Sequence, residues 1–150
     1  MRISFAGDLF LGGDLLGSSL HQALDPAIFS RSDKIIVNLE QPVSNNDVTL
    51  DKCTLHTGSD TVQELVNADI RIVSLAHNHI QDKGLDGIME TRTHLSKAGI
   101  ESFGAGADAE EARKPVWINK DLAVLGYCDF GQSYLQEIEI AKENRPGVNP

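Results

Sequence analysis

The sequence has few aromatic and few basic residues, and each shortage excludes a class of partner. Aromatic residues make up 5% of the 150 positions, too few for a surface that stacks the bases of single-stranded nucleic acid. There are 13 Lys and Arg residues against 22 Asp and Glu residues, so the formal net charge is −9. Binding to a phosphate backbone depends on clustered basic residues, and a nucleic-acid partner is therefore not expected. Bound divalent cations would still let an acidic protein hold an anionic substrate.

Cysteines and long apolar runs are also scarce. The two cysteines, Cys53 and Cys128, form no CxxC pair, and we expect two reduced, buried thiols rather than a disulfide or a zinc site. No apolar run approaches the roughly 20 residues that a membrane-spanning helix needs, and no signal-peptide pattern opens the chain. The sequence by itself therefore favours a cytoplasmic location without a membrane anchor.

The rest of the composition is that of a globular domain. With 41% apolar and 23% charged residues, the chain is long enough for one domain with a buried core. Short apolar runs alternate with segments of helical periodicity, which is typical of an α/β fold with parallel strands. Strands are expected at residues 3–6, 34–37, 70–76 and 100–103. Helices are expected at residues 15–24, 59–67 and 85–97, the last of them stopped by Gly99.

Smaller secondary-structure elements are expected in the C-terminal third of the sequence. A brief acidic helix follows Gly104-Ala105-Gly106, and a hairpin is expected from residues 116–118 and 122–127. The tail, residues 141–150, is polar and contains two prolines, and we expect no closing strand or helix in it. We interpret this tail as a cut inside a domain.

Polar residues follow three of the four expected strands. Asp8 comes after the first strand, Asn38 and Glu40 come after the second, and His77-Asn78-His79 comes after the third. In parallel α/β sheets the carboxyl ends of the strands lie along one edge, where ligands bind. Side chains that are distant in sequence are therefore expected to converge on one site.

The residue types at this edge suit a metal. Two carboxylates, an amide oxygen and imidazoles are ligands that a divalent metal takes in a hydrolytic site, where it would polarise a phosphoryl or carbonyl oxygen. Each cluster also has a purely structural interpretation, because a Gly-Asp pair after a strand is usually a turn and Glu40 alone could be a solvated loop carboxylate. Two histidines and an amide at the end of one apolar strand seldom serve packing alone, so the three clusters together favour a functional site.

Two other motif interpretations are weaker. His77-x-His79 is similar to the HxH of metallo-β-lactamase-like and amidohydrolase enzymes, but Gln81 stands where the first family needs Asp. Gly104-x-Gly106 follows a strand and resembles a dinucleotide-binding fingerprint. The helix after it is too short for a βαβ crossover, which favours glycines of a tight turn.

The order of these motifs resembles the CapA family, whose members are described as capsule or poly-γ-glutamate synthesis proteins. The resemblance rests on Gly7-Asp8-Leu9-Phe10-Leu11-Gly12, on Asn38-Leu39-Glu40 and, most specifically, on Asn78-His79-x-x-Asp82-x-Gly84. It continues through Gly104-Ala105-Gly106 to Pro115-Val116 and so covers nearly the whole chain. It implies a fold similar to calcineurin-like metallophosphoesterases, an α/β sandwich of mostly parallel strands with flanking helices. Residues 1–150 would form the N-terminal part of a single such domain, incomplete at the C-terminus.

The resemblance also implies roles for individual residues. Asp8, Glu40 and Asn78 would bind divalent metal ions, two of them, with Mn, Fe or Zn as candidates, and Glu40 could bridge the pair. His79 would be the catalytic residue that stabilises the transition state or protonates the leaving oxygen. Asn38, His77 and Asp82 would surround these ligands, with Asp82 orienting His79 or capping the next turn. His77 stands where the family usually has Asn, and it would either add a ligand or replace an outer contact.

The function that the resemblance implies is divalent-metal-dependent hydrolysis of a phosphoester or of a substrate related to an anionic polymer. The later histidine motifs, which complete the metal site in the phosphoesterases, do not occur in this sequence. The alternative is a non-catalytic binding or structural subunit of a polymer synthesis and export complex that retains the fold. A metallohydrolase that acts on amide bonds would use the same residues. The family includes membrane-anchored members, and its partners would belong to the polymer synthesis complex.

Overall fold

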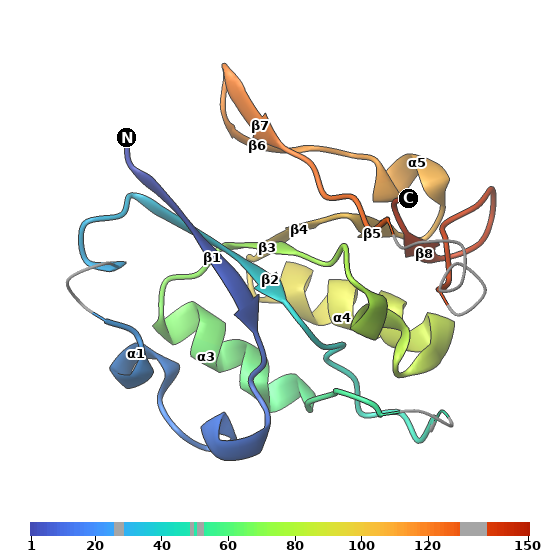
Figure 1. The fold of residues 1–150 in the computed structure, drawn as a ribbon, viewed down its shortest axis with the longest axis horizontal. Coiled ribbons are helices and arrows are strands. Elements are labelled where there is room, and N and C mark those ends of the chain that lie inside the picture. The colour runs from blue at the N-terminus through green and yellow to red at the C-terminus, as the bar shows by residue number, and fades with distance from the viewer. Residues whose placement is uncertain (26–28, 49, 51–52, 130–137) are drawn as a thin grey trace.

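A four-stranded parallel sheet lies at the centre of the computed structural model, which describes residues 1–25, 29–48, 50, 53–129 and 138–150. Its strand order is β1 (Ile3–Leu9), β2 (Lys34–Leu39), β3 (Ile72–Ser74) and β4 (Glu101–Phe103). All three neighbouring pairs are parallel, and helices connect or flank them (Figure 1). The predicted α/β class, with a mostly parallel sheet and flanking helices, is confirmed.

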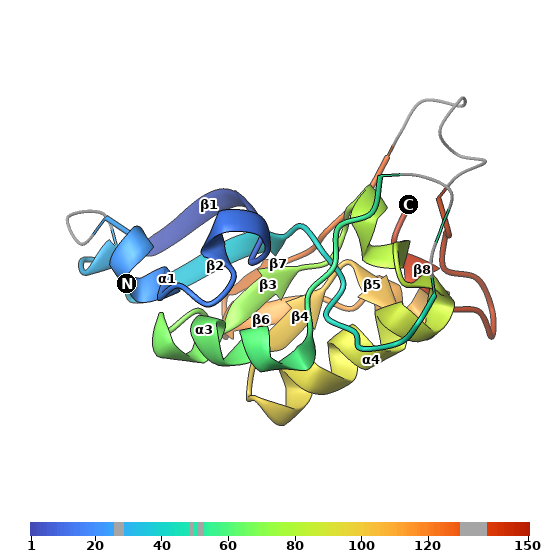
Figure 2. The same cartoon turned by 90° about the horizontal axis from the view of Figure 1, so that it is seen from below.

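The helices cover one face of this sheet. The helices α3 (Val62–Asn67) and α4 (Gly84–Lys97) lie below it in Figure 2, and the short helix α1 (Leu20–Ala23) packs against α3. Along β2, Ile35 and Val37 belong to the core on the helix side, whereas Ile36 belongs to a separate cluster on the other face. This alternation is the period of two that a strand imposes on its side chains. It explains why Ile35, Ile36 and Val37 form an unbroken apolar run within β2, since all three are buried, on both faces of the strand.

Among the described residues, a hairpin covers the opposite face of the sheet. The strands β6 (Val116–Asn119) and β7 (Leu122–Val124) form the predicted hairpin, and Val116 packs against Ile36 and Phe103. Phe5 on the edge strand β1 remains 67% exposed. This face therefore contributes a small apolar cluster, and most of the core lies between the sheet and the helices.

The predictions for the first helix and for the tail are wrong. Residues 15–24 form a 3-10 helix η1 (Gly13–Leu15) and the short α1 instead of one helix, because Gly17 between them has φ of +76°. In the tail, β8 (Gly147–Val148) pairs antiparallel with β5 (Ala105–Gly106) beside the helix α5 (Ala109–Ala112). The polar tail thus has a strand, which the sequence did not predict because a two-residue strand leaves no periodic pattern.

The other two predicted helices are confirmed. The 3-10 helix η2 (Ser59–Thr61) leads directly into α3, and α4 begins and ends within one residue of the prediction. Gly99 follows α4 with φ of +71°, and the Ile100 N–H donates to the Leu95 carbonyl at 2.9 Å. These are the features of a glycine-terminated helix end, in which the free carbonyls of the last turn gain partners.

Two expectations about solvent and membrane contact can be compared with the structure. Cys128 is buried as expected, but Cys53 is exposed, so the prediction of two buried thiols is wrong for Cys53. Both thiols are free. Within the described ranges, no helix has the length and apolar character that crossing a membrane requires.

Candidate functional site at the strand ends

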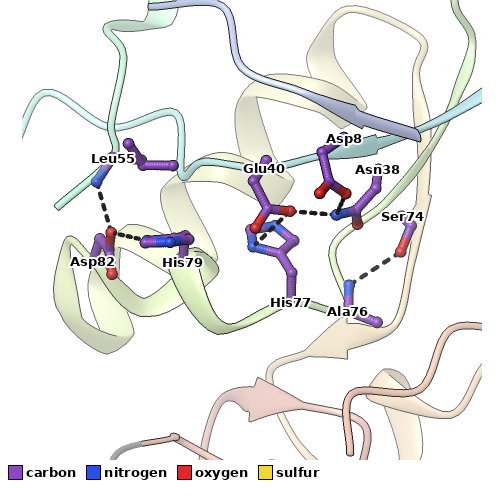
Figure 3. A network of polar contacts seen from close by, with 9 residues as sticks. All are labelled: Asp8, Asn38, Glu40, Leu55, Ser74, Ala76, His77, His79 and Asp82. Carbon is purple, nitrogen blue, oxygen red and sulfur yellow. Dashed lines mark hydrogen bonds and ion pairs between the residues drawn. The ribbon is translucent and has the colours of Figure 1, made fainter. Parts of the chain in front are cut away.

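The carboxyl ends of β1 and β2 bring Asp8, Asn38 and Glu40 together. Asp8 and Asn38 are register partners in the two strands, after an irregularity of β1 between Phe5 and Asp8. The Asn38 Nδ2 donates to Asp8 Oδ1 at 2.8 Å and also to Glu40 Oε2. The Glu40 N–H donates to the Leu9 carbonyl at 2.9 Å, which fixes the backbone beyond the end of β2. One amide group therefore holds two carboxylates side by side (Figure 3).

His77 lies directly beneath this arrangement. Its Nδ1 is 3.9 Å from Glu40 Oε2, and only 4% of its side chain is exposed (Figure 3). Neither ring nitrogen makes a hydrogen bond of good geometry within the described residues, although the Leu39 backbone lies close enough to favour the protonated ring. We call Asp8, Asn38, Glu40 and His77 the strand-end cluster.

Two glycines bring backbone close to the segment that carries His77. A Cβ on Gly104, which has φ of +87°, would come within 2.6 Å of the Ala76 Cβ, and a Cβ on Gly126 would come within 2.9 Å of the same atom. Only glycine allows this approach on both sides of Ala76. The Ser74 hydroxyl accepts a hydrogen bond from the Ala76 N–H at 3.2 Å. Packing against Gly104 and Gly126 therefore fixes the backbone that leads into His77, independently of the polar contacts of its side chain.

The electrostatics of the cluster disfavour charge on two of its members. Burial, and then the negative charge of Asp8, raises the pKa of Glu40 above its ordinary value. Burial, followed by the charge of His79, lowers the pKa of His77 to about 4. His77 is therefore neutral at pH 7, and Glu40 holds its negative charge at a cost that a nearby cation would reduce.

A second polar group lies on the 3-10 helix η3 (Asn78–Gln81), directly after His77. The His79 Nδ1 is 2.7 Å from Asp82 Oδ2, and this carboxylate oxygen also accepts from the Leu55 N–H at 2.7 Å (Figure 3). Asp82 is completely buried, whereas 22% of the His79 side chain is exposed. We call these two residues the His79–Asp82 pair. A carboxylate fixed by backbone thus holds an imidazole that solvent can reach.

Asn78 lies between His77 and His79 in the sequence. It is the first residue of η3, follows the extended backbone of His77 and is half-buried. Within the described part of the chain, no hydrogen bond joins its side chain to Asp8 or Glu40. All the candidate residues predicted from the sequence are therefore at one edge of the sheet, but only some of them are in mutual contact.

Comparison with known proteins adds the family. A family model described as "Bacterial capsule synthesis protein PGA_cap" matches residues 2–149. The chain belongs to this family.

Curated relatives agree with this membership. The "PGA biosynthesis protein CapA" of Bacillus subtilis (strain 168) is 30% identical over 165 residues, which cover 100% of this chain and 42% of the relative. A "Probable polyglutamine synthesis accessory protein" of Mycobacterium tuberculosis is 30% identical over 122 residues, which cover 78% of this chain and 32% of the relative. The "Capsule biosynthesis protein CapA" of Bacillus anthracis is 29% identical over 65% of this chain. The chain spans less than half the length of the relatives that it matches.

The side chains of this PGA_cap family member fit a divalent cation in chemical type. The cluster offers carboxylate and imidazole donors, and a buried imidazole without good hydrogen bonds is open to a ligand. Among the residues that the structure describes, however, no three His, Cys, Asp or Glu side chains gather closely enough to hold a metal ion. The donors thus have the right types but do not form a closed set of ligands in the described residues.

Cys128 is a neighbour of the cluster that the sequence did not indicate. Burial raises the pKa of its thiol to about 11, and the negative charges of Glu40 and Asp129 act in the same direction. The Cys128 N–H donates to the Asn149 carbonyl, so the tail holds this residue near the strand ends. No spacing rule relates Cys128 to Glu40, and only the tertiary structure shows that they are neighbours.

Proposed function

We propose that the strand-end cluster and the His79–Asp82 pair form the site of a divalent-metal-dependent hydrolase acting on phosphoester bonds in capsule or polyglutamate synthesis. The observation that supports it best is the pairing of Asp8 and Glu40 through one Asn38 amide. Two carboxylates held this close repel each other, and burial of Glu40 adds to the cost. A bound cation would remove both penalties.

The roles proposed here are those that the family resemblance implies, and the contacts of Asp8, Asn38 and Glu40 support them. Asp8, Glu40 and Asn78 would hold two divalent ions, with Mn, Fe and Zn as candidates. When bound, such ions would polarise a phosphoryl oxygen and offset its charge. Asn38 would keep the two carboxylates in register, because it already donates to both of them. Proximity of the carboxylates would therefore not depend on the ions.

His79 would act on the substrate. Asp82 engages its Nδ1 at 2.7 Å, which leaves Nε2 to donate to a phosphoryl oxygen or to the leaving oxygen. The Leu55 N–H fixes the carboxylate of Asp82 in turn, so the ring is oriented before substrate binds. An oriented donor contributes more to the transition state than a mobile one, since no reorganisation is needed during the reaction.

A second function, a non-catalytic subunit of a polymer synthesis complex, is supported by two other observations. Within the described residues the acidic and imidazole side chains do not form a metal site of three ligands. In addition, the name of the Mycobacterium tuberculosis relative describes that protein as an accessory protein. In this case the strand-end cluster would be a binding surface, and the partner would be another protein or the polymer of that complex.

Metal content and hydrolysis together distinguish the two functions. Purified chain would be supplied with Mn, Fe or Zn, and metal would be measured by elemental analysis alongside hydrolysis of bis-p-nitrophenyl phosphate. We expect about one or two ions per chain, loss of metal in Asp8→Ala, and retained metal with lost hydrolysis in His79→Ala. Asp14→Ala, which changes an exposed aspartate outside the site, is the matched control and should behave like the unchanged chain.

Each other result has a defined meaning. Absence of metal above background would contradict the hydrolase and leave the binding subunit as the function. Bound metal without hydrolysis of any phosphoester tested would favour a non-catalytic subunit that contains a metal ion. Metal that Asp8→Ala retains would show that the ions bind elsewhere.

A further inference from the structure

Among the residues that the structure describes, the ring of His77 lacks the hydrogen-bond partners that a buried imidazole normally has. It is 4% exposed, and neither Nδ1 nor Nε2 makes a hydrogen bond of good geometry within the described residues. Buried polar groups without partners are rare in folded proteins, because their desolvation is not compensated. Where such a group does occur, an ordered water, a bound ion or a catalytic role accounts for it.

The direction of the ring favours a bound cation. Its Nδ1 faces Glu40 Oε2 at 3.9 Å, and Glu40 is linked through Asn38 to Asp8 (Figure 3). The imidazole therefore points into a cluster of negative charge and not into the apolar core. A nitrogen lone pair and a carboxylate oxygen that face each other repel unless a proton or a cation lies between them.

We propose that His77 Nδ1 and Glu40 bind the same divalent cation, and that this nitrogen donor makes the site prefer borderline ions such as Zn²⁺ over Mg²⁺ and Ca²⁺. This inference rests on the proposed function, because it requires a cation in the strand-end cluster. It goes beyond that function by adding His77 to the ligands and by naming the class of ion. Imidazole suits zinc and other transition metals, whereas Mg²⁺ and Ca²⁺ take oxygen ligands.

The distance between the two donors is compatible with a shared ion. Ligands at about 2.0 to 2.1 Å from a tetrahedral zinc are roughly 3.4 Å apart. The observed 3.9 Å between Nδ1 and Oε2 is slightly wider, so a small rotation of the Glu40 side chain would complete the contact. A second nitrogen that faces backbone is also common for metal-binding histidines, and the Leu39 backbone lies beside this ring.

The test compares two ions in two variants of the whole chain. Affinities for Zn²⁺ and Mg²⁺ would be measured by competition with a chromophoric chelator in the unchanged chain and in His77→Asn. We expect Zn²⁺ binding to weaken about 100-fold and Mg²⁺ binding to change less than about threefold. His21→Asn, which changes an exposed histidine away from the site, should leave both affinities unchanged. Thermal unfolding by circular dichroism would confirm that each variant is folded.

A direct signature of ligation gives a second readout that does not depend on folding of a variant. In long-range proton–nitrogen spectra of the unchanged chain, Zn²⁺ should shift the His77 Nδ1 resonance, whereas Mg²⁺ should not. An unshifted His77 resonance at saturating Zn²⁺ would overturn the inference and leave an ordered water as the partner of the ring. Equal weakening of both ions in His77→Asn would likewise overturn it, because the ring would then only support the fold of the site.

The inference and the proposed function fail in different ways. Zinc that binds the unchanged chain and His77→Asn equally, and is lost in Asp8→Ala, would overturn the role of His77 and leave the metal site in place. A chain that binds neither Zn²⁺ nor Mg²⁺ would overturn both.

Discussion

The strand-end cluster and the His79–Asp82 pair lie side by side in space (Figure 3), but their polar groups differ in how well they are hydrogen-bonded. In the His79–Asp82 pair, the buried carboxylate accepts from the Leu55 N–H and contacts the imidazole at 2.7 Å. In the strand-end cluster, two carboxylates share one amide, and the buried His77 ring has no good hydrogen bond among the described residues. The pair is held by two short contacts to Asp82 Oδ2 without a ligand, whereas the cluster contains two repelling carboxylates and an imidazole without a good hydrogen bond among the described residues.

This difference separates a group that has its partners in the free protein from a group that a bound cation would stabilise. Removal of one partner from a buried hydrogen-bonded pair destabilises the free protein, because the other partner is left uncompensated. A cluster of like charges reduces the stability of the free protein and becomes favourable only when a cation binds. Removal of a charge from the His79–Asp82 pair should therefore lower the free energy of unfolding, whereas removal of a charge from the strand-end cluster should raise it.

The largest expected change in the free energy of unfolding comes from a substitution in the His79–Asp82 pair. Asp82→Ala should lower the free energy of unfolding by about 3 to 4 kcal/mol, because it leaves the Leu55 N–H and the His79 ring without their buried partner. Urea unfolding followed by circular dichroism measures this change. Asp8→Ala, which removes an exposed carboxylate of the strand-end cluster, is the comparison and should not destabilise the chain. Similar losses of stability in Asp82→Ala and Asp8→Ala would contradict the proposed difference between the two groups.

The next effect is a dependence of stability on pH that originates at His77. The pKa of His77 in the folded chain is about 4, below the ordinary value of 6.5. Between these two pH values the imidazole is protonated in the unfolded chain but not in the folded chain. This contribution to stability is therefore complete above pH 6.5 and is lost as the pH falls, by about 2 kcal/mol between pH 7 and pH 4.5.

Urea titrations of the unchanged chain and of His77→Asn at these two pH values measure it. His77→Asn should lack this part of the dependence, whereas His21→Asn should retain it because His21 is exposed. An identical loss of stability on acidification in all three chains would show that His77 is not held neutral by burial.

The smallest expected effect is a gain of stability in Glu40→Gln. The substitution removes a half-buried charge beside Asp8 and keeps an oxygen that can accept from Asn38, so the free energy of unfolding of the metal-free chain should rise at pH 7. The sign is opposite to that of His77, because the raised pKa of Glu40 lets the folded chain hold a proton to higher pH than the unfolded chain. Stability is therefore lost as the pH rises above 4.5.

Glu101→Gln is a suitable control, since Glu101 is an exposed carboxylate on β4. Glu101→Gln should change the free energy of unfolding little at pH 7. A loss of stability in Glu40→Gln would mean that its charge already has a favourable partner in the metal-free chain.

The sequence predicted which strands carry the polar residues but not how far each strand extends. Asp8 was expected in a turn after residues 3–6, and it lies inside β1 as the register partner of Asn38. Propensity favours a break at Gly7, whereas pairing with β2 extends β1 to Leu9, because hydrogen bonds to a neighbouring strand override the local preference. The same competition made the predicted third strand too long, since β3 pairs only over Ile72–Ser74.

The sequence by itself determined the α/β class and the edge of the sheet at which Asp8, Glu40, His77 and His79 meet. Both follow from local patterns, since the period of apolar residues sets strand and helix, and parallel strands bring their carboxyl ends to one edge. Only the tertiary structure decided that Asp82 Oδ2 accepts from the Leu55 N–H, that His77 has no good hydrogen bond among the described residues, and that Cys128 lies near Glu40. These properties depend on burial and on backbone groups brought from distant elements, and neither is encoded in the spacing of the residues concerned.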